Sequence, residues 1–215
     1  MKGLNKNVLG KIDQRGKDFF IQYRSSGFAG EFQIDRDKLW NLIRKMNFTK
    51  SQREEIEIIE KKLRLISTRN RITHMIILGI IEHQTAFLRS YDPLDVTPLN
   101  QVQISNWIKD QGYRWIDNSM VSRVTNNALI VILPNEKPML VKDFFQSSRD
   151  IYKRHIKEIL FKEEMELKLK RLNRPYSDEE IRIKLKEIYG IHILRRTVSY
   201  CRNQMGIPPF HKRAY

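Results

Sequence analysis

The amino-acid sequence predicts a mainly α protein made of a helical module, a winged helix-turn-helix and a small C-terminal helix-turn-helix. Apolar residues recur every three to four positions through most of the chain, which is the spacing of an amphipathic helix. Proline and glycine interrupt this pattern at a few places and divide the chain into segments. Of the 215 residues, 40% are hydrophobic and 10% aromatic, which suffices for packed cores and excludes a wholly disordered chain.

The first module, residues 1–90, opens with β-prone residues and continues as helices. Phe19–Tyr23 and Glu31–Ile34 have β character, and the Ser/Gly-rich stretch between them suits a hairpin or a loosely paired extended segment. The apolar spacing then predicts three helices, of which the second begins near Thr49 or Ser51. The side chains expected to face inward are those of Leu39, Leu42, Ile43, Met46, Ile56, Ile59, Leu63, Ile66, Ile72, Ile76, Ile80 and Phe87.

Residues 91–150 carry the pattern of a winged helix-turn-helix. A short helix that contains Ile104 and Trp107 ends at Gly112, and Asp117 offers an N-cap for a second helix. Two β-prone apolar stretches follow, joined by a turn bounded by two prolines, and they predict a hairpin wing. These stretches are Leu129–Leu133 and Met139–Val141.

The second helix of this module is a candidate for contact with nucleic acid. Val121 and Val124 are expected to face inward, so the polar side chains between them face solvent. Residues 95–150 contain six basic and six acidic side chains, and this neutrality leaves a packing role without DNA open. The candidate contact residues are Ser119, Ser122, Arg123 and Asn126.

A charged helix at 151–170 has few apolar repeats and is expected to be a linker. It precedes the last module, residues 171–215. There Ser177 and Glu180 have the spacing of a capping box, and Gly190 is placed to end the helix that they begin. Ile181, Leu185 and Ile188 are its expected apolar stripe. A second helix is predicted from about Leu194 to Gln204.

This last helix has the composition of a DNA-recognition helix. Leu194, Val198, Cys201 and Met205 recur on one apolar face, and polar residues occupy the remaining faces. A guanidinium group matches the O6/N7 edge of guanine, so Arg195 and Arg196 in the first turn are the candidates for reading bases. A pair of solvated arginines is the alternative. The further candidate contacts are Thr197, Ser199, Tyr200 and Arg202, of which Thr197 and Arg202 are expected to contact phosphate.

The basic charge is concentrated near the C-terminus. The chain carries a net charge of +15, and residues 171–215 hold ten basic against four acidic side chains. Lys212 and Arg213 are therefore expected to contact DNA phosphates without regard to sequence. A merely solubilising surface would explain the charge equally well.

The sequence offers no sign of catalytic, metal or cofactor chemistry, and no small-molecule ligand is expected. The five histidines lack metal-ligand spacing, and the single cysteine excludes an internal disulfide or a cysteine-cluster zinc site. No apolar run approaches the 18 residues of a membrane span, and the first residues do not resemble a secretory signal. We therefore expect a cytoplasmic protein with no enzyme activity of its own.

Several segments, taken together, resemble the bacterial sigma-54 transcription factors. The segment Leu194–Arg202 is similar to the C-terminal box of that family, A-R-R-T-V-A-K-Y-R, with Tyr200 at its lysine and Cys201 at its tyrosine. Ser119–Val124 resembles the family's S-T-V-S-R-V, and Lys142–Ser148 its L-K-x-F-F-S. Arg69–Phe87 is similar to a helix that binds core RNA polymerase.

The resemblance implies a factor that binds core RNA polymerase and recognises promoters with upstream GG and downstream GC elements. Polymerase contacts are expected from Arg69, His83 and Gln84, exposed on the first module. The family's Gln/Leu-rich activator region is absent here, so activator ATPases are expected as partners only of a longer form. A stand-alone DNA-binding repressor or antagonist is the alternative function. An RNA-binding or ribosome-associated protein would account for the charge but not for the arginine helix.

Overall fold

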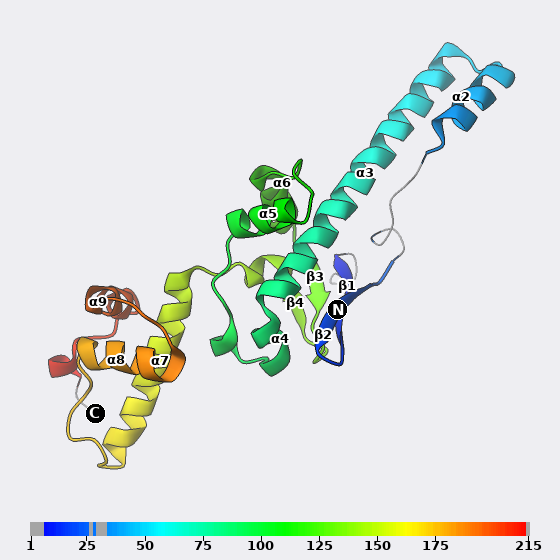
Figure 1. Ribbon diagram of the computed structural model, residues 1–215. Coiled ribbons are helices and arrows are strands. Elements are labelled where there is room, and N and C mark those ends of the chain that lie inside the picture. The colour runs from blue at the N-terminus through cyan, green and yellow to red at the C-terminus, as the bar shows by residue number, and fades with distance from the viewer. Residues whose placement is uncertain (1–6, 26–27, 29–33, 214–215) are drawn as a thin grey trace. The chain divides into compact units, whose positions relative to one another are not determined.

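The computed structural model describes residues 7–25, 28 and 34–213, and the chain folds into two compact units (Figure 1). Unit 1 comprises Met1–Arg89 and Asn100–Phe145, and unit 2 comprises Ser90–Leu99 and Gln146–Tyr215. The predicted mainly α fold is confirmed. The division differs from the expected one, because the first two modules share unit 1 and the expected linker shares unit 2 with the last module.

The secondary structure is mostly helical, with one small sheet in unit 1. The elements of unit 1 are β1 (Val8–Arg15), β2 (Asp18–Tyr23), α2 (Arg36–Lys45), α3 (Lys50–His83), α4 (Thr85–Ser90), α5 (Gln101–Asp110), α6 (Asn118–Thr125), β3 (Ile130–Ile132), β4 (Pro138–Leu140) and η3 (Val141–Phe144). Those of unit 2 are η2 (Pro93–Asp95), α7 (Ser148–Lys168), α8 (Asp178–Tyr189), α9 (Arg195–Gln204) and η4 (Phe210–Lys212).

The sheet joins the N-terminal hairpin to the wing of the first helix-turn-helix. Its strand order is β2-β1-β3-β4, and only β1 and β3 are parallel. A Cβ atom on Gly10 would lie 2.3 Å from the carbonyl oxygen of Gln22, so only glycine allows β1 and β2 to approach this closely. The expected strand at Phe19–Tyr23 is confirmed, but its partner is β1, which the sequence analysis missed. Of the other expected strand, residues 31–33 lie outside the described residues and Ile34 is not in a strand.

Helix α3 is continuous over 34 residues, so the prediction of two separate helices here is wrong. A capping box between Thr49 and Gln52 begins it. Its second half is buried because α5, α6 and β2 pack on it, whereas Ile59 and Ile66 in its first half are exposed, contrary to prediction. In α2, too, Ile43 is buried as predicted but Leu42 is exposed.

The winged helix-turn-helix is confirmed, and it packs directly on α3. Asp117 caps α6, and β3 pairs with β4 as the predicted wing. At the crossing of α3 and α5, a Cβ atom on Gly79 would lie 2.8 Å from Ile104 and 3.0 Å from Trp107. This glycine therefore sets how closely the helix-turn-helix approaches α3.

In unit 2, α7, α8 and α9 share one hydrophobic core. Its buried residues are Ile156, Ile159, Leu160, Tyr176, Ile181, Leu185, Val198 and Cys201. The expectation of a linker at 151–170 is thus wrong, because α7 supplies three of these side chains. The capping box at Ser177 and the left-handed Gly190 at the end of α8 are as predicted. Ile188 is exposed, which corrects the expected stripe.

Candidate nucleic-acid interface

The first turn of α9 presents two arginines to solvent. Arg195 and Arg196 are both exposed, and neither guanidinium hydrogen-bonds or ion-pairs with any residue that the structure describes. Val198 and Cys201 on the opposite face are buried in the core, where burial raises the pKa of the Cys201 thiol. Two cations at a helix N-terminus oppose the helix dipole, so folding alone does not favour them there. Both arginines are free to bind an anionic partner.

Arg202, by contrast, is a buried structural residue. Its side chain is 3% exposed, and its guanidinium donates to both carboxylate oxygens of Asp178, at 2.7 and 3.1 Å, and to the carbonyl of Ile207 at 2.6 Å. Burial alone would raise the pKa of Asp178, but Arg202 and Ser199 hold that pKa below its usual value. The phosphate contact expected of Arg202 is not supported, because its donors join α9 to α8.

The two basic residues near the C-terminus differ in the same way. Lys212 is exposed and has no partner among the described residues, as a phosphate-binding lysine requires. Arg213 is buried, lies 3.3 Å from the buried carboxylate of Glu163 and donates to the carbonyl of Tyr176. Its expected phosphate contact is likewise not supported, since it fixes the last described residue of the chain to the core of unit 2.

The side chain of Tyr200, on α9, contacts Arg149 of α7. Its ring is 46% exposed, and the guanidinium carbon of Arg149, in the first turn of α7, lies 5.2 Å from the ring centroid. Thr197 and Ser199 are half-buried beside it on α9. Nothing in the sequence predicted this contact, because Arg149 is 51 positions from Tyr200 and was assigned to the winged helix-turn-helix segment, residues 91–150.

In unit 1, the candidate residues of α6 are only partly available. Ser119 donates to Asp117 at 2.7 Å, and Asn126 donates to Ser122 at 3.2 Å. Arg123 is exposed, and its guanidinium has no hydrogen-bond partner among the described residues. Arg123 is therefore the basic side chain of α6 that is available to a partner. Ser119, Ser122 and Asn126 make hydrogen bonds within this segment.

The three residues expected to contact polymerase lie in different surroundings. Arg69 is exposed on α3. His83 is half-buried, with its ring edge-on to Trp107 at 6.4 Å and its Nδ1 2.8 Å from the carbonyl oxygen of Gly79. Gln84 is fully buried and donates to the carbonyl of Phe144, so the expectation that it is exposed is wrong.

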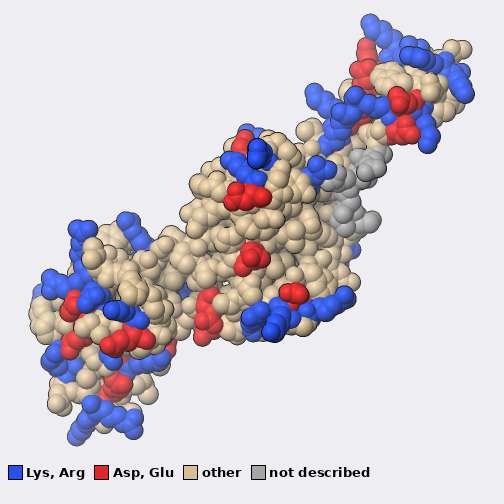
Figure 2. All heavy atoms as spheres, viewed as in Figure 1, with Lys and Arg blue, Asp and Glu red and all other residues tan. Residues whose placement is uncertain are grey.

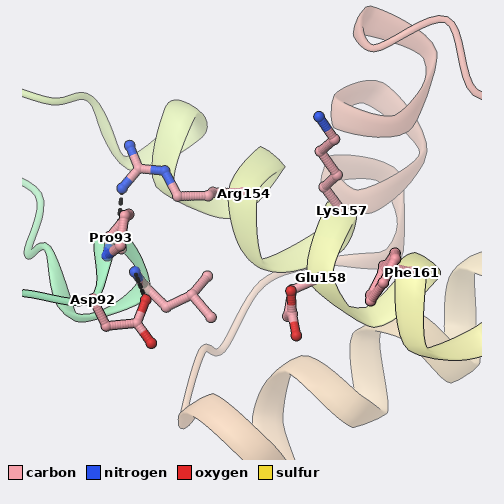
Figure 3. Close-up of a pocket in the computed structure, with 7 residues that line it drawn as sticks. Asp92, Pro93, Arg154, Lys157, Glu158 and Phe161 are labelled. Carbon is pink, nitrogen blue, oxygen red and sulfur yellow. Dashed lines mark hydrogen bonds between the residues drawn. The ribbon is translucent and has the colours of Figure 1, made fainter.

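A hollow of about 590 Å³ lies between η2 and α7 in unit 2. Figure 3 shows the Asp92 carboxylate capping η2 and Arg154 donating to the carbonyl of Pro93. Arg154 also donates to Gln146. The charged groups on this side of the hollow therefore hold η2 against α7, and Lys157, Glu158 and Phe161 line the rest of it.

The described residues were also examined for metal-binding groups and for membrane-spanning helices. In that part of the chain, His, Cys, Asp and Glu side chains do not gather in any group that could hold a metal ion. No helix there is long and apolar enough to cross a membrane.

Charged side chains are unevenly distributed over the surface. In the view of Figure 2, Lys and Arg gather over the surface of unit 2 and over α2 with the first half of α3. The part of unit 1 that holds the sheet and the helix-turn-helix shows few charged side chains in this view. The exposed arginines of α9 thus belong to the more strongly basic of the two helix-turn-helix segments.

The chain is similar to a protein family, to a solved structure and to a curated protein. Residues 46–215 match the family described as "Sigma-54, DNA binding domain". The chain is also similar to the protein in the crystal structure of Aquifex aeolicus sigmaN bound to promoter DNA. The match covers 97% of the present chain, with a TM-score of 0.57 and 27% sequence identity. This chain covers 59% of that sigmaN chain. The chain is also 26% identical over 169 residues to the regulatory protein RecX of Clostridium acetobutylicum, covering 73% of this chain and 77% of RecX.

Proposed function

The chain belongs to the sigma-54 DNA-binding domain family and has a sigma-54-like DNA-binding role, and from this premise we propose that it acts as a sigma-54-type initiation factor. In this role it binds core RNA polymerase and directs it to promoters with an upstream GG and a downstream GC element. The observation that carries the proposal is the first turn of α9, where Arg195 and Arg196 are exposed and unpaired among the described residues.

The DNA contacts divide into two kinds in this proposal. Arg195 and Arg196 read guanines through bidentate hydrogen bonds, each of which contributes about 1–3 kcal/mol of discrimination. Thr197, Ser199 and Lys212 contact phosphates near them and fix the register of α9 on the duplex. In unit 1, Arg123 on α6 contacts the downstream element, with Ser119, Ser122 and Asn126 beside it.

The polymerase contact is proposed for the first half of α3. Four large apolar side chains there are 44–63% exposed, namely Ile58, Ile59, Leu65 and Ile66. Residues seven apart in a helix lie on the same side, which places Ile58 above Leu65 and Ile59 above Ile66, and the two pairs are about 100° apart round the helix. Together the four side chains form a patch about two turns long, which we call the α3 patch. Exposed apolar side chains gathered in this way are typical of a protein interface. Arg69 follows the patch along α3 and adds a cation at its edge.

We expect the double substitution Ile59→Glu and Ile66→Glu to weaken binding of core polymerase at least tenfold, because it places two carboxylates in an apolar contact. Binding to a promoter duplex should stay within twofold of wild type. Arg53→Glu, which adds a carboxylate on an exposed side of α3 away from the patch, is the control. Polymerase binding measured by surface plasmon resonance checks this, and unchanged binding of the double variant would contradict the placement on α3.

A direct test of the function combines polymerase pull-down with transcription in vitro. The chain should capture core polymerase and direct it to a duplex that carries the GG and GC elements, but not to a duplex with both elements replaced. A DNA-binding repressor or antagonist would bind the same duplex yet reduce transcription from it. Failure to capture polymerase while promoter binding is retained would reject the initiation factor and favour the repressor.

A further inference from the structure

The contact between α7 and α9 extends the proposed DNA interface beyond the recognition helix. We propose that Arg149 of α7 contacts a DNA phosphate and that the ring of Tyr200 on α9 holds its guanidinium in position. This inference rests on the proposed DNA-binding role of α9.

The geometry leaves the hydrogen-bond donors of Arg149 available. Its guanidinium carbon lies 5.2 Å from the centroid of the Tyr200 ring, within the range of a cation–π contact. A guanidinium held over a ring is covered on one face, while its N–H groups point outward from its edge. Those groups match the oxygens of a phosphate, so stacking and phosphate binding are compatible.

The charges around Arg149 also favour an external anion. Arg149 is exposed and has no ion pair among the described residues. The adjacent carboxylate, Asp150, accepts from the Ser147 hydroxyl at 2.6 Å and lies 3.9 Å from Lys153, so it is already engaged. Arg149 stands in the first turn of α7, where the helix dipole disfavours a cation. Among the described residues, the fold therefore gives this arginine no carboxylate partner.

The position of Tyr200 explains how α7 contributes to the surface of α9. In the resemblance noted above, Tyr200 stands at a lysine of the C-terminal box, so α9 itself lacks that positive charge. Arg149 restores a positive charge over this site from a neighbouring helix of the same unit (Figure 1). Lys153, one turn further along α7, also lies near α9, because its charge, like that of Arg149, acts to lower the pKa of the Cys201 thiol against the effect of burial.

The test is binding of Arg149→Ala to a GG-containing duplex over a range of salt concentrations. Losing one phosphate contact should lower the slope of log K against log salt by about 0.9, which corresponds to about eightfold weaker binding at 0.1 M salt if the difference vanishes at 1 M. The loss should be equal on GG-mutated duplexes, because phosphate carries no sequence information. Lys170→Ala, which removes one exposed positive charge two residues after the end of α7, is the control and should bind like wild type.

Two further variants test the role of the ring. Tyr200→Phe keeps the aromatic face and should retain the wild-type salt slope, whereas Tyr200→Leu should lose most of what Arg149→Ala loses. The double variant Arg149→Ala, Tyr200→Leu should be no weaker than Arg149→Ala alone, because the two residues act through one contact. Circular dichroism confirms that each variant is folded.

The outcomes separate this inference from the proposed function. If Arg149→Ala binds DNA as tightly as wild type and its salt slope equals the wild-type slope, the inference is overturned and the proposed function is unaffected. Failure of the wild-type chain to prefer GG duplexes would overturn the proposed function instead. A slope that falls for Arg149→Ala but not for Lys170→Ala supports the inference.

Discussion

At the scale of single residues, arginine serves two opposite purposes in unit 2. Arg195 and Arg196 are exposed and unpaired among the described residues, whereas Arg202, six positions further along α9, is almost fully buried. The difference arises because the side of α9 that carries Arg202 faces α8, where Asp178 provides a bidentate partner. Exposure and partner, rather than residue type, decide which arginine can reach DNA.

We predict that Arg202→Ala destabilises unit 2 by about 3 kcal/mol, because it leaves the largely buried Asp178 carboxylate and the Ile207 carbonyl without their donor. Arg196→Ala, which removes an exposed arginine from the same helix, should stay within about 0.5 kcal/mol of wild type. Urea denaturation followed by circular dichroism measures both. Equal stability of the two variants would show that Arg202 is not the structural residue described here.

The lowered pKa of Glu180 makes the stability of unit 2 depend on pH in the acidic range. The Arg174 guanidinium and the Ser177 hydroxyl and N–H lower its pKa from 4.5 to about 2. A depressed carboxyl pKa contributes stability that is present above pH 4.5 and is lost as the pH falls towards 2. The variant Glu180→Gln should therefore lose less stability than wild type across this interval. Thermal unfolding at pH 5, 4, 3 and 2 tests this, and parallel curves for the two proteins would contradict it.

At the scale of elements, the close approach of α3 and α5 depends on Gly79, although glycine has a low propensity for the α-helix. We predict that Gly79→Ala destabilises unit 1 by about 1–3 kcal/mol, although alanine is favoured over glycine in a helix by about 1 kcal/mol. The added methyl group would lie 2.8 Å from Ile104 and 3.0 Å from Trp107, so both side chains would have to shift within the packed crossing. Thermal unfolding decides the sign, and a rise in melting temperature would mean that the crossing can relax.

The elements also show where sequence reasoning succeeds and where it stops. The termini of α6 and α8 could be predicted, since Asp117, Ser177 and Gly190 act through neighbours two to five positions away. The parallel pairing of β1 with β3 could not, because it joins segments over 100 residues apart. For the same reason the sequence located the exposed arginines of α9 but gave no indication of Arg149 or of the partners that bury Arg202 and Gln84.

At the scale of the whole chain, each unit combines one helix-turn-helix with a long helix that supports it. In unit 1, α5 and α6 pack on α3, whose first half carries the exposed α3 patch. In unit 2, α8 and α9 pack on α7, which also supplies Arg149. Deletions within either long helix would therefore unfold the attached helix-turn-helix, so point substitutions are the suitable probes of both proposed interfaces.

The central claim is that Arg195 and Arg196 read guanine bases, and binding to matched and GG-mutated duplexes tests it most directly. Arg195→Ala and Arg196→Ala should each lose about 1–3 kcal/mol on the GG duplex and much less on the mutated one. Lys212→Ala should weaken binding to both duplexes alike and lower the salt slope by about 0.9. If either arginine variant instead loses affinity equally on both duplexes, that arginine contacts only phosphate, and the claim that it reads bases is contradicted.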